Sequence, residues 1–428
     1  MSAGLLSYNE AATLVTAFTA NLDAGQRTVE RVVLARAQSR VLARALSADQ
    51  DQPPFARSTR DGFACRAAEA SSYMFLRVAG ATHAGQAPSG PLPANAAWEI
   101  MTGAPVPSGA DAVVMLEHVE KDADMSGAHM RLLPPRTIDA GDNIVARGAQ
   151  AKKGDVLLPA GSRLGPAQIA LAATCGYASL DVYTRPRVAI LTTGDELVPV
   201  DWEPGPGQIR NSNAPMLAAL VADAGGEPWV LPAAADRDDA LDNALREAIE
   251  ADLLLISGGV SAGKFDLVEP ALARIGARFH FTGVRIQPGK PLVFGEVQRS
   301  RLGSRAETGA RVLPFLGLPG NPVSSAVTFL LFAAPVLAAL AGEGGSGPRF
   351  ALAQLAEDTD RRTKPGLTRF LPASCDFNPS TAQFPQVETV QWQGSGDLAA
   401  FARSNCFLVV PEDAGSLEAG AMVRILMI

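Results

Sequence analysis

The chain has 428 residues, 47% of them hydrophobic and 19% charged, so it is long enough for several globular domains and too apolar for a disordered protein. Its net charge is −7, and no run of Lys or Arg exceeds two residues, which argues against a nucleic-acid partner. The four cysteines are too far apart in sequence for a CxxC or zinc motif, and reduced thiols in a cytosolic protein are the simplest interpretation.

The N-terminal residues lack a charged segment followed by an apolar one, so we expect no signal peptide. The longest apolar stretch, residues 326–342, is short for a membrane span and contains Pro335. We therefore expect a cytoplasmic protein without a membrane partner, in which this stretch forms a buried or interface helix.

Residues 1–50 are predicted to be helical, and Ser7 with Glu10 has the spacing of a capping box. Short β-like runs broken by Gly and Pro then predict a β-rich subdomain over about residues 51–160. Residues 163–183 are expected to form a helix followed by a strand. Together these segments make a predicted N-terminal region over residues 1–185.

Strands and helices alternate from residue 186 onward, beginning with the apolar run "RVAILT". This alternation predicts an α/β domain over residues 186–342, with a parallel sheet covered by helices on both faces. After that domain the chain is again β-like, which predicts a small β-barrel over residues 343–428. The predicted fold class is thus a multidomain α/β protein with a central three-layer domain.

Three polar loops follow strands of the α/β domain: "TTGDEL" (192–197), "SGGVSAGKFD" (257–266) and "LPGNPVSS" (318–325). The carboxyl ends of parallel strands meet at one edge of a sheet, so these loops should form a single site. Their glycines and hydroxyls suit phosphate, and their carboxylates suit Mg²⁺ lying between acid and anion. No loop has the spacing of a P-loop or a dinucleotide motif.

The "PGNP" turn places Asn321 where an N-cap is expected and Pro322 at the first helical position. A strand, a tight turn and a helix start together can bind an anion through unpaired backbone N–H groups. An ordinary βα turn that binds nothing has the same local pattern, so the turn alone leaves both interpretations open.

The three loops resemble those of the MoeA-type molybdopterin molybdenumtransferases, the family that includes the gephyrin E domain. The resemblance extends over roughly residues 7–426, because further family-like segments occur in the family's order. These are "PPFARSTRDGFACR" (53–66), "IMTGAPVPSGADAVVMLE" (100–117), "GDNIVARG" (141–148), "QPGKPLVFG" (287–295) and "QGSGDL" (393–398).

This resemblance implies an enzyme that converts adenylylated molybdopterin and molybdate into the molybdenum cofactor and AMP, with Mg²⁺ as cofactor. It also implies a homodimer, in which each site lies between the α/β domain of one subunit and the β-rich domain of the other. A separate molybdopterin adenylyltransferase and molybdoenzyme chaperones are the expected protein partners.

By the same resemblance, Asp61, Glu196 and Asp266 are expected to be catalytic. Glu196 and Asp266 are candidate Mg²⁺ ligands, with Asp236 as a third. Lys290 is expected to face molybdate or phosphate. The other expected substrate-binding residues are Thr102, Gly103, Thr193, Gly194, Asp195, Ser257, Gly258, Gly259, Ser261, Pro319, Gly320, Asn321, Pro322, Ser324, Arg369 and Ser395.

The chain departs from the family's pattern at several positions. Arg60 stands where Met is expected, Gln150 replaces an acid, Lys264 replaces a frequent Asp, Gln287 replaces a frequent Lys, and Pro372 follows a segment that lacks the family's Arg. These changes affect expected oxyanion contacts more than the fold.

Two other functions remain open. The chain could be a molybdopterin adenylyltransferase, although the related adenylylating proteins consist of the α/β domain alone. It could also be a non-catalytic carrier or scaffold that binds molybdopterin, which the missing acid at Gln150 favours and the retained Asp61, Glu196 and Asp266 oppose. Release of AMP that depends on molybdate distinguishes the transferase from both.

Overall fold

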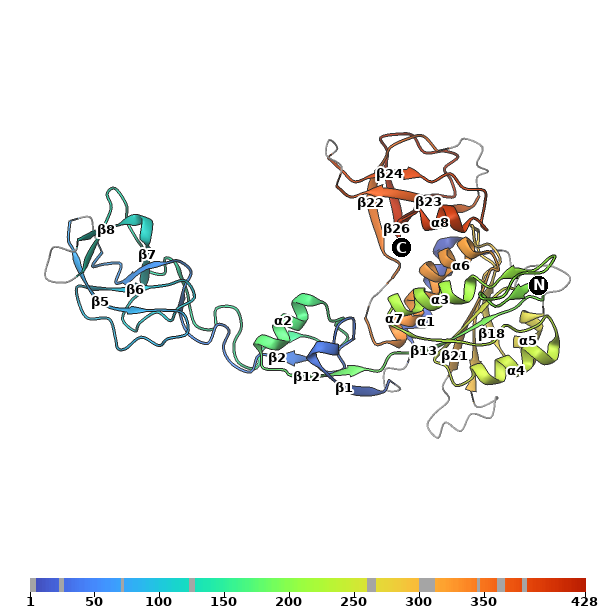
Figure 1. Ribbon diagram of the computed structural model, residues 1–428, viewed down its shortest axis with the longest axis horizontal. Helices are drawn as coiled ribbons and strands as arrows, with labels where there is room; N and C mark the ends of the chain where they lie inside the picture. The colour runs from blue at the N-terminus through green and yellow to red at the C-terminus, as the bar shows by residue number, and fades with distance from the viewer. Residues whose placement is uncertain are drawn as a thin grey trace.

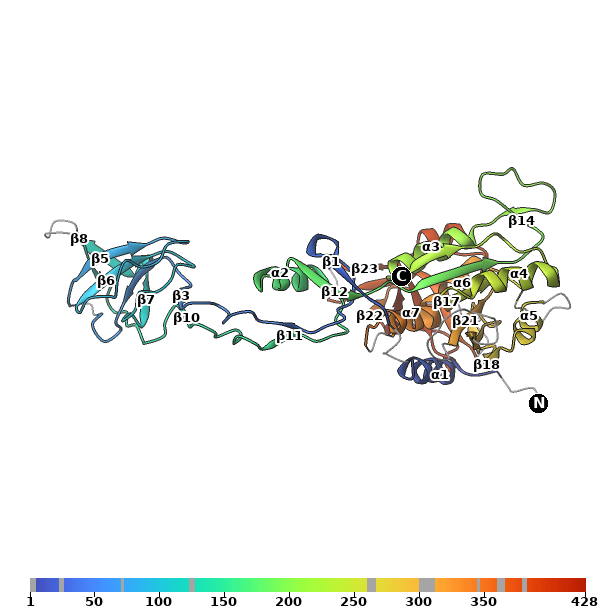
Figure 2. The same ribbon diagram turned by 90° about the horizontal axis from the view of Figure 1, so that it is seen from below.

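The structure is a computed structural model that describes residues 5–22, 27–70, 73–122, 128–259, 267–299, 312–344, 347–359, 366–378 and 383–428. The chain is extended along one axis (Figures 1 and 2). The α/β domain and the C-terminal barrel lie at one end. We call residues 53–147, at the other end, the distal lobe; the middle lobe between the two ends contains residues 27–52 and 148–184.

The α/β domain is built on a six-stranded sheet in the order β16-β13-β17-β21-β20-β18. The strands are β13 (Arg187–Thr192), β16 (Glu227–Val230), β17 (Leu253–Ser257), β18 (Arg278–Thr282), β20 (Val293–Gln298) and β21 (Val312–Leu318). The first four strands in this order are parallel, as predicted, but β20 pairs antiparallel with both β21 and β18. The prediction of a parallel sheet is therefore wrong for this edge, because residues 283–292 join β18 to β20 without the helix that a parallel crossover needs.

Helices cover both faces of this sheet, as predicted (Figure 1). Alternate strand residues divide between two buried clusters: Val188 and Ile190 pack with α1, α3, α6 and α7, whereas Ala189 and Leu191 pack with α4 and α5. The helices are α1 (Tyr8–Ala20), α3 (Asn213–Asp223), α4 (Asp238–Ala248), α5 (Val268–Arg274), α6 (Pro322–Thr328) and α7 (Ala334–Leu340).

The segment Pro322–Leu340 is one long helix, with a π turn, η5 (Phe329–Ala333), between α6 and α7. The turn lies directly before Pro335, whose missing N–H cannot complete the α-helical pattern. The segment is long and apolar enough to cross a membrane, but 72% of its most apolar window is buried inside the protein. It serves here as a core helix of the α/β domain.

The N-terminal region is helical only in part. Ser7 and Glu10 form the predicted capping box at the start of α1. The expectation of helices up to residue 50 is otherwise wrong, because the valine-rich segment β1 (Val29–Val33) pairs with β12 (Ser179–Tyr183) in the middle lobe. The middle lobe also contains η2 (Leu34–Arg36), β2 (Leu46–Ser47), β11 (Val156–Leu158) and α2 (Pro166–Thr174).

The distal lobe is the predicted β-rich subdomain, and its sheet has the order β7-β4-β6-β5-β9-β8. Its elements are β3 (Arg57–Ser58), β4 (Gly62–Cys65), β5 (Leu76–Thr82), β6 (Ala96–Ile100), β7 (Ala112–Met115), η3 (Leu116–His118), β8 (Val119–Asp122), β9 (His129–Leu132) and β10 (Ile144–Val145).

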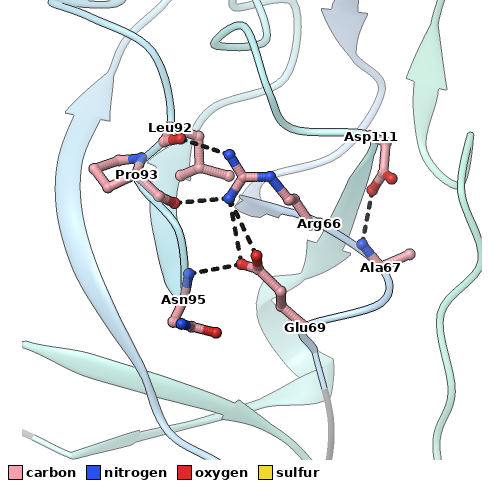
Figure 3. A network of polar contacts seen from close by, with 7 residues as sticks. All are labelled: Arg66, Ala67, Glu69, Leu92, Pro93, Asn95 and Asp111. Atoms are coloured by element: carbon pink, nitrogen blue, oxygen red, sulfur yellow. Dashed lines mark hydrogen bonds and ion pairs between the residues drawn. The ribbon is translucent and has the colours of Figure 1, made fainter.

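A polar network fixes the loops of the distal lobe (Figure 3). The guanidinium group of Arg66 donates to the Leu92 and Pro93 carbonyls at 2.8 Å and pairs with Glu69 at 3.3 Å. Glu69 in turn accepts a hydrogen bond from the backbone N–H of Asn95. The network connects the turn after β4 to the loop before β6, so these loops are held by contacts within the distal lobe itself.

The predicted C-terminal barrel is present: β23, β24, β22, β26 and β25 pair in that order, and β25 pairs back with β23. Its elements are β22 (Phe350–Leu355), β23 (Thr368–Asp376), β24 (Gln386–Thr389), α8 (Leu398–Ala402), β25 (Cys406–Val410) and β26 (Met422–Met427). The short strand β19 (Ile286–Gln287) of the α/β domain pairs with β23 and joins the two domains.

Candidate functional site

A cavity of about 1030 Å³ opens at the carboxyl edge of β13, β17 and β21 and extends to the barrel. The loops 192–197 and 318–325 meet at this edge as predicted, together with residues 257–259 of the second loop; residues 260–266 lie outside the described part of the chain. The cavity is lined by fourteen of the residues proposed from the sequence, namely Thr193, Gly194, Glu196, Asp236, Ser257, Gly258, Gly259, Lys290, Pro319, Gly320, Asn321, Pro322, Ser324 and Ser395.

The first two loops are in direct contact. The backbone N–H of Thr193 donates to the Ser257 carbonyl at 3.0 Å. Gly258 has φ +97°, and a Cβ placed there would lie 2.5 Å from the Thr193 carbonyl oxygen. A larger residue would therefore push the two loops apart, which explains the glycine at this position.

Asn213, at the start of α3, holds the second and third loops together. Its side-chain amide donates to the Ser257 hydroxyl at 2.8 Å and to the Gly320 carbonyl at 2.6 Å. The Ser325 hydroxyl, beneath them, donates to the Pro319 carbonyl at 2.7 Å. Asn213 is not among the residues expected from the sequence; the signal for it is the "NSN" run (211–213) at the start of the first helix that follows the first loop.

The "PGNP" turn starts a helix, as predicted, with Asn321 at the N-cap and Pro322 at the first position. The Asn321 side chain does not cap this helix; its amide donates instead to the Ser395 hydroxyl at 2.8 Å. The Val323 backbone N–H donates to the Ser395 carbonyl at 3.0 Å. The Val323 backbone N–H, one of the donors expected to bind an anion, is therefore already hydrogen-bonded to a loop of the barrel.

Three carboxylates, those of Asp195, Glu196 and Asp236, stand at the α/β side of the cavity. Asp195 does not line the cavity but accepts a hydrogen bond from the Asp236 backbone N–H at 3.1 Å. Burial, and then the neighbouring charges of Asp195 and Glu196, raise the pKa of Asp236. Within the part of the chain that the structure describes, none of these three acids forms an ion pair.

This oxygen-only, negatively charged donor set suits Mg²⁺ in its chemistry. The described residues do not by themselves form a group of three ligands placed around one ion. The third expected acid, Asp266, lies outside the described residues, as do Ser261 and Lys264.

On the barrel side, Lys290 is exposed and lines the cavity. Arg369, which the sequence analysis also expected to bind substrate, does not line it and is only 3% exposed. Its Nε donates to Gln287 Oε1 at 3.3 Å, and burial lowers the pKa of Arg369.

Asp61, Thr102 and Gly103 lie in the distal lobe, away from the cavity (Figure 1). Asp61 Oδ1 accepts from the Thr102 backbone N–H at 2.6 Å and from its hydroxyl at 2.8 Å. These hydrogen bonds lower the pKa of Asp61. Asp61 and Thr102 are therefore in contact with each other, but neither is near the cavity of its own chain.

Comparison with known sequence families finds three matches that follow one another along the chain. Residues 6–176 match the MoeA N-terminal region (domain I and II), residues 189–339 a probable molybdopterin binding domain, and residues 354–428 the MoeA C-terminal region (domain IV).

Relatives and solved structures agree with these matches. The chain is 35% identical to a molybdopterin molybdenumtransferase of Bacillus subtilis over 94% of its own length and 90% of the relative's. It is 33% identical to one of Haemophilus influenzae, over 92% and 93% of the two chains. The crystal structure of a molybdopterin biosynthesis MoeA protein from Pyrococcus horikoshii superposes with a TM-score of 0.78 at 28% identity, covering 99% of this chain and 100% of that one.

Fold, cavity and relatives together define a multidomain transferase of molybdenum cofactor biosynthesis. The chain belongs to the MoeA family of molybdopterin molybdenumtransferases.

Proposed function

We propose that this chain transfers molybdenum from molybdate to adenylylated molybdopterin, forming the molybdenum cofactor and releasing AMP. The observation that supports this most directly is the single cavity in which the acids of the α/β domain and Lys290 and Ser395 of the barrel side face one substrate-sized space. A reaction between a phosphate ester and a metal oxyanion needs such a combination of negative donors and anion contacts.

In this proposal the barrel side binds the oxyanions. Lys290 contributes a positive charge there, and the Ser395 hydroxyl and nearby backbone N–H groups contribute neutral donors. The hydrogen bonds of Asn321 and Val323 to Ser395 hold these donors in place before substrate arrives.

Glu196 and Asp236 would hold Mg²⁺ on the α/β side, together with Asp266. The ion supplies Lewis-acid stabilisation of charge on the phosphates when it is bound. The mutual repulsion of Asp195, Glu196 and Asp236 supports a cation at this place, because a bound cation would relieve it.

We further propose that the working form is a homodimer in the cytoplasm. Asp61 and Thr102 of the distal lobe would then reach the cavity of a second copy, since the same chain does not bring them there. A molybdopterin adenylyltransferase that supplies the substrate, and chaperones of molybdoenzymes that receive the product, would be its partners.

The test is AMP release from adenylylated molybdopterin by the purified full chain, with and without molybdate. Molybdate-dependent release supports the transferase. Consumption of ATP with free molybdopterin would instead support the adenylyltransferase, and binding without either reaction would support a carrier. Sedimentation at micromolar protein tests the dimer: a species of twice the 44.6 kDa chain mass supports it, and a monomer contradicts it.

A further inference from the structure

The two ends of the cavity differ in chemistry. The α/β end is polar, with Thr193, Glu196, Asn213 and Asp236 on its walls. The barrel end carries one indole: Trp392 is the only aromatic residue among the described residues that line the cavity. The other residues that line the cavity are polar, glycine, proline or aliphatic, so the indole offers the ligand a kind of contact that no other lining side chain provides.

Trp392 is held in place from several directions. It is half-buried and packs against the buried cluster that the α/β domain shares with the barrel. On one side the Val390 backbone N–H donates to the Pro372 carbonyl at 2.9 Å, and on the other the Gln393 N–H donates to Asp397 Oδ2 at 3.0 Å. These hydrogen bonds fix the backbone on both sides of Trp392, and the packing of its side chain restricts the indole, so binding against it costs little side-chain entropy.

Trp392 also lies close in sequence to an oxyanion contact. Ser395 follows it by three residues, a distance that an extended chain spans in at most about 10 Å. Ser395 is fixed against α6 by its contacts with Asn321 and Val323. A ligand with a flat ring joined to a phosphate through a short linker matches this arrangement.

We propose that Trp392 is the platform on which a flat heteroaromatic ring of the substrate stacks. The inference rests on the proposed function, whose substrate carries two such rings, a pterin and an adenine. Indole faces stack on bicyclic heteroaromatic rings with little regard to ring identity, so both rings share the required chemistry. Trp392 would thus fix the orientation of the substrate, while Lys290 and Ser395 hold its charged part.

The experiment titrates the full chain separately with AMP and with a phosphorylated pterin, following tryptophan fluorescence and heat of binding. The variants are Trp392→Leu and Trp392→Phe. Trp202→Phe is the matched control, because Trp202 is 62% exposed and does not line the cavity. Thermal unfolding of each variant shows whether it is folded.

For the ring that stacks on Trp392, Trp392→Leu should weaken binding roughly ten- to a hundredfold, the range found for losing one base–aromatic stack. Trp392→Phe keeps a ring and should weaken it by less than about fivefold, but most of the fluorescence quenching should disappear. Trp202→Phe should retain both affinity and quenching. The AMP and pterin arms then identify which ring is bound.

Unchanged affinity for both ligands in a folded Trp392→Leu variant would overturn the inference. If that variant does not fold, full quenching retained in Trp392→Phe would do the same. The proposed function is judged separately, by molybdate-dependent AMP release in the unmodified chain. If the unmodified chain releases AMP normally but the Trp392 variants bind both ligands as it does, the stacking role of Trp392 is wrong and the transferase activity is still supported.

Discussion

The cavity and the distal lobe hold candidate site residues in different ways. At the cavity, residues from distant parts of the sequence are joined by hydrogen bonds between elements, such as those of Asn213 and Asn321. In the distal lobe, the Asp61 carboxylate accepts hydrogen bonds from Thr102 on an exposed surface, with no cavity residue beside it. The cavity encloses enough space to hold a ligand. Asp61 and Thr102 can contact a ligand only when another surface packs against the distal lobe.

The largest expected effect is at the acidic side of the cavity. Glu196→Gln should lower molybdate-dependent AMP release by two or more orders of magnitude, because it removes a charge that holds the metal. Asp201→Asn is the matched control, since Asp201 is an exposed acid close by in sequence that does not line the cavity. Equal rates in the two variants would remove Glu196 from the metal site.

The next prediction tests the division of the site between the two regions. Asp61→Asn and Glu196→Gln chains should each be nearly inactive alone. When they are co-expressed and pair at random in a two-fold dimer, about a quarter of all sites contain neither substitution, so about a quarter of the activity should return. Differently tagged chains allow the mixed dimer to be isolated and assayed. No recovery in that mixed dimer would place Asp61 and Glu196 in the site of one chain, whereas an Asp61→Asn chain that is fully active alone would place Asp61 outside the site.

A third prediction concerns Lys290, one of the two basic residues, with Arg210, among the described residues that line the cavity. Lys290→Ala should raise the molybdate concentration for half-maximal rate roughly ten- to a hundredfold, the scale of one lost charge-assisted contact. High molybdate should restore the rate, whereas it should not rescue Glu196→Gln. Lys153→Ala is the control, because Lys153 is an exposed lysine of the middle lobe. An unchanged molybdate dependence would mean that the anion binds elsewhere.

A smaller effect is expected at the loop that presents Ser395. The Asp397 carboxylate accepts from the backbone N–H groups of Ala400 and Gln393, both at 3.0 Å. Asp397→Ala should therefore reduce activity roughly three- to tenfold, the scale of losing one such hydrogen bond, through misplacement of Ser395. Asp397→Asn, which still accepts hydrogen bonds, should lose less. Equal activity in all three proteins would show that the loop keeps its position without this carboxylate.

Asp397 also makes the stability of the barrel depend on pH. Hydrogen bonds from Ala400 and then Gln393 lower the pKa of Asp397 in the folded chain. Its stabilising contribution is thus present above the ordinary value of about 3.9 and is lost as the pH falls from there through the folded pKa. The stability difference between wild type and Asp397→Asn, measured by denaturant unfolding, should shrink over that interval. A difference that is constant with pH would contradict this assignment.

The smallest expected signal is the reactivity of two thiols, one in each region. Burial raises the pKa of Cys65, in the distal lobe, and of Cys406, in the barrel, to about 12. Almost no thiolate exists at pH 8, so neither should react with a disulfide reagent until its region unfolds. Thiol labelling along a denaturant titration, read by peptide mass, would then report the two regions separately. Rapid labelling of Cys65 in native buffer would show that the distal lobe opens without unfolding.

Much of this architecture could be predicted from the sequence because its signals are local. The loops 192–197 and 318–325 and the first helical residue Pro322 follow from strand and turn patterns over a few residues. The strand over residues 29–33 could not be predicted in this way, because its pairing partner, residues 179–183, is far away in sequence. The contact of the Ser395 carbonyl with Val323 could not be predicted either, because it depends on how the barrel docks on the α/β domain.

The packing of α1 determines when the α/β domain can be completed during synthesis. Ala11 and Val15 of α1 are buried in the same cluster as Val336 and Leu337 of α7, more than 320 residues later in the chain. At typical translation rates, roughly 15 to 60 seconds separate the appearance of the two helices at the ribosome. During that interval the apolar face of α1 has no α7 to pack against, while the middle and distal lobes can already fold. The helix α1 is therefore synthesised early but packs into the core late. A nascent chain stalled before α7 would leave the apolar face of α1 exposed to chaperones.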